Sequence, residues 1–105
     1  MDYKFTEANF EAEVLNSETP VLVDFYADWC GPCKMMMPTV EKMAETYDGK
    51  IKVGKINTDE NGSLAARYGI MSIPSFLIFK NGQVVDTMTG AMPAEALASR
   101  LDAQL

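Results

Sequence analysis

Hydrophobic positions along the chain follow two patterns, one typical of buried strands and one typical of amphipathic helices. The segment 21–27 is apolar on both faces apart from Asp24, which predicts a strand inside a sheet. Strands are expected at residues 2–5, 21–27, 51–57, 75–79 and 84–88. Helical spacing is found at residues 7–16, 32–47, 61–68 and from 93 onward. The order β-α-β-α-β-α-β-β-α predicts an α/β fold with a central mixed sheet covered by helices.

Turn and helix-end residues support these boundaries. Gly49 is expected to stop the second helix, and Pro38 inside it is expected to cause a kink. Asn81-Gly82 predicts a tight hairpin, and Pro93 is expected in the first turn of the last helix. Each of three helices has a face that is expected to be buried. In the first helix, capped by Thr6, this face is Phe10, Val14 and Leu15. In the second it is Met36, Val40, Met43 and Tyr47, and in the last it is Leu97, Leu101 and Leu105.

Composition narrows the classes of protein to consider. The 105 residues are expected to form a single domain, residues 1–105, and 48% of them are hydrophobic, enough for one core. A net charge of -6 disfavours nucleic acid as a partner. No stretch approaches the roughly 20 apolar residues of a membrane span, and no export signal is seen at the amino terminus. We therefore expect a soluble, cytoplasmic protein that binds no membrane.

The only two cysteines, Cys30 and Cys33, are two residues apart, a spacing that suits a zinc site, a haem attachment site or a redox dithiol. Zinc would need carboxylates to complete its ligands, because the chain has no His and no other Cys. Haem attachment would need His where Lys34 stands. A purely structural disulfide would close too short a loop to stabilise the fold appreciably. The redox dithiol is the favoured interpretation, with no metal bound.

The predicted helix start divides the roles of the two thiols. Cys30 precedes the helix, where the helix dipole and free N–H groups favour a thiolate, so it is assigned as the attacking group. Cys33 lies about a turn later, facing the interior, and is assigned as the resolving thiol. Gly31 allows close approach of a substrate backbone, and Pro32 suits the first helical position. The pair carries no charge, which favours a reductant over an oxidant.

Asp24 and Lys55 are candidates for proton transfer. A buried Asp24 could take the proton of Cys33, because burial raises the pKa of a carboxyl group toward neutrality. The alternative, a structural or solvent-facing Asp24, is equally compatible with the sequence. Lys55 could pair with Asp24 or simply be a solvated strand lysine.

The segment Trp29-Cys30-Gly31-Pro32-Cys33-Lys34 resembles the active-site signature of the thioredoxin family. Further landmarks of that family follow in the expected order over essentially the whole chain: Val23-Asp24-Phe25, Pro38, Lys55-Ile56-Asn57, Asp59, Tyr68-Gly69-Ile70, Ile73-Pro74-Ser75, Phe79-Lys80-Asn81-Gly82 and Gly90. The departures are mild. Tyr26 replaces a frequent Trp, Met35-Met36-Met37 is unusually rich in Met, and Met71-Ser72 removes a frequent positive charge.

The resemblance implies a thioredoxin fold, with a five-stranded mixed sheet and four helices. It implies an exposed nucleophile at Cys30, a buried resolving thiol at Cys33, a cis bond before Pro74, and Asp24 buried near Lys55. It also implies a shallow substrate groove formed by Trp29, Gly31, Pro32, Ile73, Pro74, Thr89, Gly90 and Ala91.

The activity implied is that of a monomeric protein-disulfide reductase that binds no cofactor itself. Electrons would come from NADPH through thioredoxin reductase. Clients implied by the resemblance include ribonucleotide reductase, peroxiredoxin and methionine sulfoxide reductase. A disulfide oxidase or isomerase, and a docking module with incidental thiols, are the alternatives.

Overall fold

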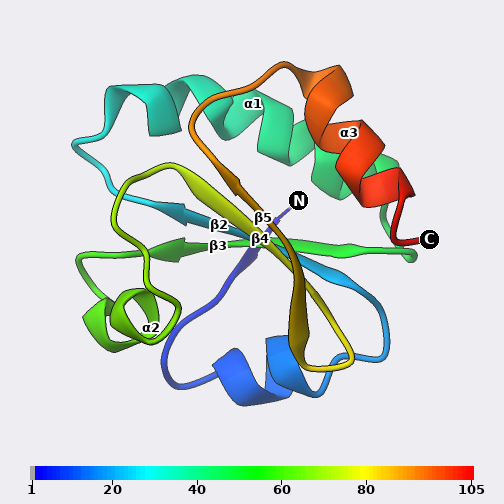
Figure 1. Cartoon of the computed structure of the whole chain (residues 1–105), viewed down its shortest axis with the longest axis horizontal. Helices are drawn as coiled ribbons and strands as arrows, with labels where there is room; N and C mark the ends of the chain where they lie inside the picture. Colours follow the sequence, from blue (N-terminus) through cyan, green and yellow to red (C-terminus); the bar gives the residue numbers. More distant parts are fainter. Residues whose placement is uncertain (1) are drawn as a thin grey trace.

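The computed structural model describes residues 2–105 and contains five strands and four helical segments (Figure 1). In chain order these are β1 (Tyr3–Lys4), η1 (Glu11–Leu15), β2 (Val21–Tyr26), α1 (Gly31–Thr46), β3 (Lys52–Asn57), α2 (Gly62–Arg67), β4 (Ser75–Lys80), β5 (Gln83–Thr89) and α3 (Ala94–Asp102). The predicted order of elements is confirmed.

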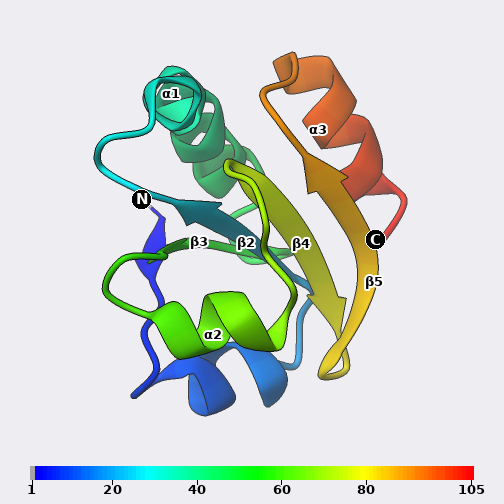
Figure 2. The same ribbon diagram turned by 60° about the vertical axis from the view of Figure 1, so that its left-hand side comes forward.

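The strands form one sheet in the order β1-β3-β2-β4-β5. β3 pairs in parallel with both β1 and β2, and β4 pairs antiparallel with β2 and β5, so the sheet is mixed as predicted. Because β2 and β3 run parallel, their carboxyl ends lie at the same edge of the sheet, and the loop to α1 leaves from that edge (Figure 2).

Helices cover both faces of the sheet. α1 and α3 lie on one face, and η1 and α2 lie on the other (Figure 1). Side chains alternate between these two layers along β2. Val21, Val23 and Phe25 pack in the η1 and α2 layer, whereas Leu22 packs in the α1 and α3 layer. By the same alternation Asp24 points toward α1, the helix that carries the cysteines.

Most of the predicted boundaries hold within one or two residues. Thr6 Oγ1 accepts from Asn9 N at 3.3 Å in the turn before the helix, but the N-cap of η1 is Phe10 and not Thr6 as predicted. The regular part of this first helix is only the π-helix η1, shorter than the predicted 7–16. Asn81 and Gly82 have φ values of 54° and 78°, as the predicted tight hairpin requires.

Two predictions about the last helix are wrong. Leu105 does not continue the stripe of Leu97 and Leu101, because α3 ends at Asp102 and Leu105 is 64% exposed. Pro93 is the N-cap and not the first helical residue.

Pro38 lies within α1, and the helix continues through it to Thr46. Within residues 2–105, no helix has the length and apolar character needed to cross a membrane.

Candidate active site

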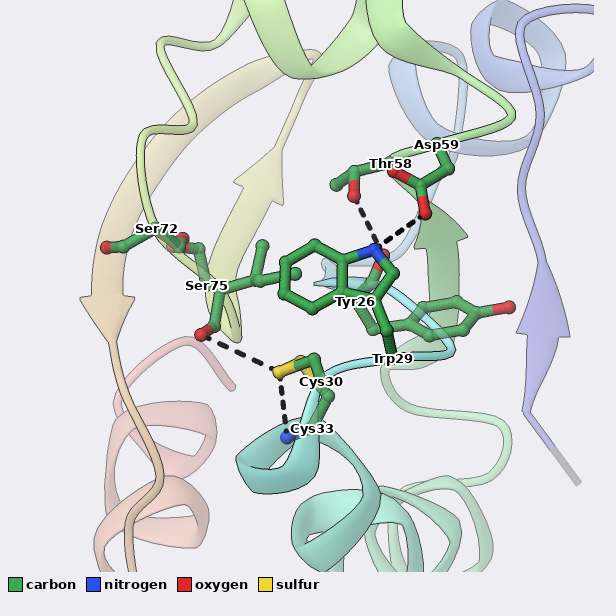
Figure 3. Close-up of a disulfide and its surroundings, with 9 residues drawn as sticks. Tyr26, Trp29, Cys30, Cys33, Thr58, Asp59, Ser72 and Ser75 are labelled. Atoms are coloured by element: carbon green, nitrogen blue, oxygen red, sulfur yellow. Dashed lines mark hydrogen bonds between the residues drawn. A yellow bond between two sulfur atoms is a disulfide. The ribbon is translucent and has the colours of Figure 1, made fainter.

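Cys30 and Cys33 are joined by a disulfide at the amino end of α1, with their Cα atoms 5.2 Å apart (Figure 3). Cys30 is the N-cap of α1 and has extended backbone angles. The backbone N–H of Cys33 donates to Cys30 Sγ at 3.2 Å. Pro32 occupies an early helical position where no hydrogen-bond donor is needed. The helix start therefore directs one of its free N–H groups at Cys30.

Both cysteines are buried in this disulfide form. Cys30 is 4% exposed and Cys33 is 2% exposed. They pack with Ala27, and Ile73 lies against them. An exposed Cys30 was implied by the family resemblance, and this is wrong for the disulfide form. Ala27 and Ile73 pack against Cys30, and the N–H of Cys33 is hydrogen-bonded to its sulfur.

The predicted groove residues come from three separate loops that meet at the disulfide. Cys30 Sγ lies 3.8 Å from the carbonyl oxygen of Ile73, and the following Ile73–Pro74 bond is cis, as predicted. Pro74 is buried, and its carbonyl accepts from Gly90 N at 2.8 Å. This bond joins the Pro74 loop to the end of β5. Exposed groove positions are Trp29, Gly31, Pro32, Thr89 and Ala91.

Trp29 is 70% exposed and is held by its ring nitrogen. Trp29 Nε1 donates to Asp59 Oδ2 at 2.9 Å, across the site from the disulfide (Figure 3). Thr58, next to Asp59, donates from Oγ1 to the carbonyl oxygen of Tyr26 at 3.0 Å and ties this loop to the end of β2. Trp29 thus projects a fixed apolar surface at the rim of the groove.

On the other side of Cys33 lies a cavity of about 320 Å³. It lies between the ends of β2 and β3 and the first turns of α1, and it is lined by Asp24, Tyr26, Ala27, Asp28, Cys33, Lys34, Met37 and Lys55. Cys33 therefore has the groove loops on one side and a partly polar cavity on the other.

Asp24 is the buried acid of this cavity. Burial raises the pKa of its carboxyl group from 3.8 to about 7, while the nearby charge of Lys55 lowers the pKa and that of Asp2 raises it. Asp24 Oδ1 makes no hydrogen bond to any residue between 2 and 105. Asp24 is therefore buried, lacks a full set of hydrogen-bond partners and is half ionised near neutral pH. Such a carboxyl group is well suited to exchange a proton.

Lys55 is opposite Asp24 in the pairing of β2 with β3, so the predicted neighbourhood is observed. Its ammonium group, however, forms its ion pair with Asp2, Nζ to Oδ2 at 3.8 Å, and no ion pair within 4 Å to Asp24 is present in residues 2–105. It also lies 5.6 Å from the ring centre of Tyr26. Lys55 influences Asp24 through space without a direct contact.

Comparison with known proteins agrees with this geometry. The family model described as Thioredoxin matches residues 2–103. The chain belongs to the thioredoxin family. It is 56% identical to Thioredoxin 1 of Synechococcus elongatus over 100 residues, covering 95% of this chain and 94% of that protein. It is 57% identical to the thioredoxin of Pyropia yezoensis over 97 residues, covering 92% of this chain and 91% of the relative. The thioredoxin of Chlorobaculum thiosulfatiphilum is 49% identical over 100 residues, with 95% and 93% covered.

Family membership and the Cys30–Cys33 disulfide together establish a thiol–disulfide oxidoreductase, a protein-disulfide reductase. Thioredoxin chemistry needs no bound cofactor. In the described part of the chain no three or more Cys, Asp or Glu side chains are grouped as metal ligands would be.

Sequence reasoning missed three contributors to the thioredoxin site. Asp59 was noted only as a family landmark, and its bond to Trp29 depends on a loop that follows β3. Asp28 and Asp2, which lies near Lys55, had no sequence signal, because nothing in local spacing connects them to the cysteines. The Met35–Met37 run divides between surface and core, because Met35 is strongly exposed and Met36 is buried. Met71, in the loop before Ile73, is also strongly exposed.

Proposed function

We propose that Cys30 attacks the disulfide of a client protein and that Cys33 resolves the mixed disulfide. The observation that carries this assignment is the bond from Cys33 N to Cys30 Sγ at the start of α1. In the dithiol form the same N–H group and the helix dipole stabilise a thiolate at Cys30. Cys33 lies inside the first turn of α1 and lines the cavity, and its side chain does not cap the helix.

The reaction balances in two steps. The Cys30 thiolate attacks one client sulfur, a Cys30–client bond forms, the client disulfide breaks, and the departing client thiolate takes up a proton. Cys33 then gives up its proton and attacks Cys30 Sγ. The Cys30–Cys33 bond forms, the mixed disulfide breaks, and the second client thiolate leaves. Two electrons have passed from the cysteine pair to the client.

Asp24 is the proposed acceptor of the Cys33 proton. Both residues line the same cavity, and a pKa of about 7 lets the Asp24 carboxyl group accept and release a proton near neutral pH. Lys55 is proposed to limit that pKa, because its positive charge favours the ionised carboxylate. The cavity gives the proton a route toward solvent.

The client is proposed to bind as an extended segment across Trp29, Gly31, Pro32, Ile73, Pro74, Thr89, Gly90 and Ala91. The exposure of Trp29 and Pro32 beside the disulfide supports this placement.

The proposed electron source is NADPH, delivered through thioredoxin reductase. Proposed clients are ribonucleotide reductase, peroxiredoxin and methionine sulfoxide reductase, reduced by a monomer whose residues 1–105 form one domain. A cytoplasmic location is proposed because a catalytic Cys-x-x-Cys pair suits a reducing compartment.

The direct test is reduction of insulin disulfides by the purified chain, with and without thioredoxin reductase and NADPH. We expect continued NADPH consumption, beyond the one equivalent that reduces the Cys30–Cys33 disulfide itself, only when the chain, the reductase and insulin are all present. The reduction potential should lie near the thioredoxin reference value of about −270 mV. A potential of about −200 mV or higher would instead indicate an oxidase or isomerase.

A further inference from the structure

Lys55 is held by an acid other than the one it faces in the sheet. Pairing of β2 with β3 places Lys55 opposite Asp24, and alternation sends both side chains toward α1. The ion pair of Lys55 is nevertheless with Asp2, at 3.8 Å. The lysine is therefore turned toward the β1 edge of the sheet.

Asp2 directly precedes β1 and lies near both β3 and α1. The residues that follow it form β1, whose pairing places Tyr3 beside Gly54 and Lys4 beside Lys55. The side chain of Asp2 is only 8% exposed, and that of Lys55 is 27% exposed. On the helix side, hydrogen bonding to Asp2 raises the pKa of Glu41 of α1. Asp2 thus pairs with Lys55 of β3 and lies near the carboxyl group of Glu41 of α1.

Asp2 and Lys55 act on Asp24 in opposite directions. Lys55 lowers the pKa of Asp24, and Asp2 raises it. If Asp2 lost its charge, two effects would both lower the pKa of Asp24. Direct repulsion between the two carboxylates would disappear, and Lys55 would be free to turn toward Asp24.

We propose that Asp2 is a positioning residue for proton transfer, which holds Lys55 away from Asp24 and so keeps the Asp24 carboxyl group protonatable at neutral pH. This inference rests on the proposed role of Asp24. The other titratable groups around the cavity are Tyr26 of β2, Asp28 of the following loop, and Cys33 and Lys34 of α1, with Glu41 beside Asp2. Lys55 Nζ also lies 5.6 Å from the ring centre of Tyr26, but Asp2 is the acid with which it forms an ion pair.

The test is the titration of the Asp24 carboxyl carbon by ¹³C NMR in the disulfide form, in which neither cysteine titrates. In Asp2→Asn the midpoint should fall by roughly half a pH unit, the scale of one partly screened charge. The matched control is Glu60→Gln, which removes one negative charge from an exposed pair with Lys4. An unchanged midpoint in Asp2→Asn, or equal shifts in both variants, overturns the proposal.

A second comparison isolates the holding of Lys55. In a Lys55→Gln background only direct repulsion by Asp2 remains, so Asp2→Asn should shift the midpoint less than it does in the native chain. Equal shifts in both backgrounds would mean that Asp2 acts through space alone, which overturns the positioning role. Asp2→Ser should reproduce the shift of Asp2→Asn, because both remove the charge.

Kinetics then separate this inference from the proposed function. The pH profile of mixed-disulfide resolution should move to lower pH together with the NMR midpoint in Asp2→Asn. If the midpoint moves and the kinetic profile does not, Asp2 tunes Asp24 as inferred but Asp24 is not the proton acceptor. If neither moves, the inference about Asp2 fails while the role of Asp24 is left standing.

Discussion

Asp24 is a carboxyl group in a place where an apolar side chain would stabilise the fold more. It belongs to the layer of Leu22, between the sheet and α1, and its Oδ1 has no hydrogen-bond partner in residues 2–105. Its pKa is about 7 in the folded chain and near 3.8 when unfolded. Three pKa units at about 1.4 kcal/mol each give a destabilisation of about 4 kcal/mol once Asp24 is ionised.

The pH dependence of stability follows from the sign of that shift. Between pH 4 and 7 the folded chain keeps a proton on Asp24 that the unfolded chain releases, so this group makes stability fall as pH rises. In Asp24→Asn this contribution is absent. We expect the free energy of unfolding of the variant, minus that of the native chain, to increase by roughly 2–3 kcal/mol between pH 5 and pH 8. Urea unfolding of the disulfide form at both pH values measures it, and a difference independent of pH would contradict it.

The same substitution should impair turnover. Without an acceptor for the Cys33 proton, we expect Asp24→Asn to slow resolution of a preformed mixed disulfide at least about tenfold at pH 7. Asp28→Asn is the matched control, because Asp28 lines the same cavity but is exposed. Stopped-flow release of the client thiol gives the rates. Native rates in Asp24→Asn would remove Asp24 from the mechanism.

At the scale of elements, the amino end of α1 distinguishes two chemically identical thiols. Cys30 caps the helix and accepts the N–H of Cys33, whereas Cys33 lies inside the first turn. After reduction we therefore expect iodoacetamide to modify Cys30 faster than Cys33 below neutral pH. Mass spectrometry of peptides at short reaction times reports the ratio, and equal rates would overturn the assignment of roles.

The carboxyl end of α1 is tied to α3 by a buried tyrosine. The hydroxyl group of Tyr47 donates to Asp102 Oδ1 at 2.6 Å and lies 3.2 Å from the carbonyl oxygen of Ala98. Burial, with the hydrogen bond to Asp102, raises the pKa of Tyr47 to about 12. This contact anchors the far end of the helix that carries the cysteines.

Removing that hydroxyl group should weaken the fold without changing the chemistry. We expect Tyr47→Phe to lower the free energy of unfolding by about 1–2 kcal/mol, since Asp102 and Ala98 lose a donor. Tyr3→Phe on the half-exposed β1 is the control. Urea unfolding measures both, and insulin reduction by Tyr47→Phe at 25 °C should stay within about twofold of the native rate. A loss of stability equal to that of Tyr3→Phe would contradict the role of the contact.

At the scale of the whole molecule, the site exists because loops from distant parts of the chain converge on one helix end. The Cys30 loop, the Ile73–Pro74 turn and the end of β5 are joined by contacts between residues more than 15 positions apart. The client is expected to meet all three loops at once.

Trapping a client tests the roles of the two cysteines at this site. In Cys33→Ser the first step is intact and the second cannot occur, so mixed disulfides with clients should accumulate on Cys30. In Cys30→Ser they should not accumulate. Non-reducing gels after mixing with a disulfide client report the complexes, which should disappear when dithiothreitol is added. Full client function of a Cys30→Ser, Cys33→Ser double variant would instead indicate a docking module.

Local patterns predicted the elements well and the ends of helices less well. The 21–27 run and Asn81-Gly82 carry their own structural preference, so β2 and the β4–β5 hairpin were found. Leu105 was misplaced because helical spacing alone does not show where α3 ends. The shielding of Cys30 was missed because it comes from Ile73, 43 residues away.

The amino-acid sequence by itself determined the chemistry of the site. Two thiols at this spacing, with no His and no other Cys, leave a reversible dithiol as the favoured function, and the helix start after Cys30 divides the roles. Only the tertiary structure decided the environment of Asp24 and the partner of Lys55. Burial and ion pairing depend on which strands and helices meet. Asp2, the acid that pairs with Lys55, precedes β1, and no local pattern specifies that β1 lies beside β3.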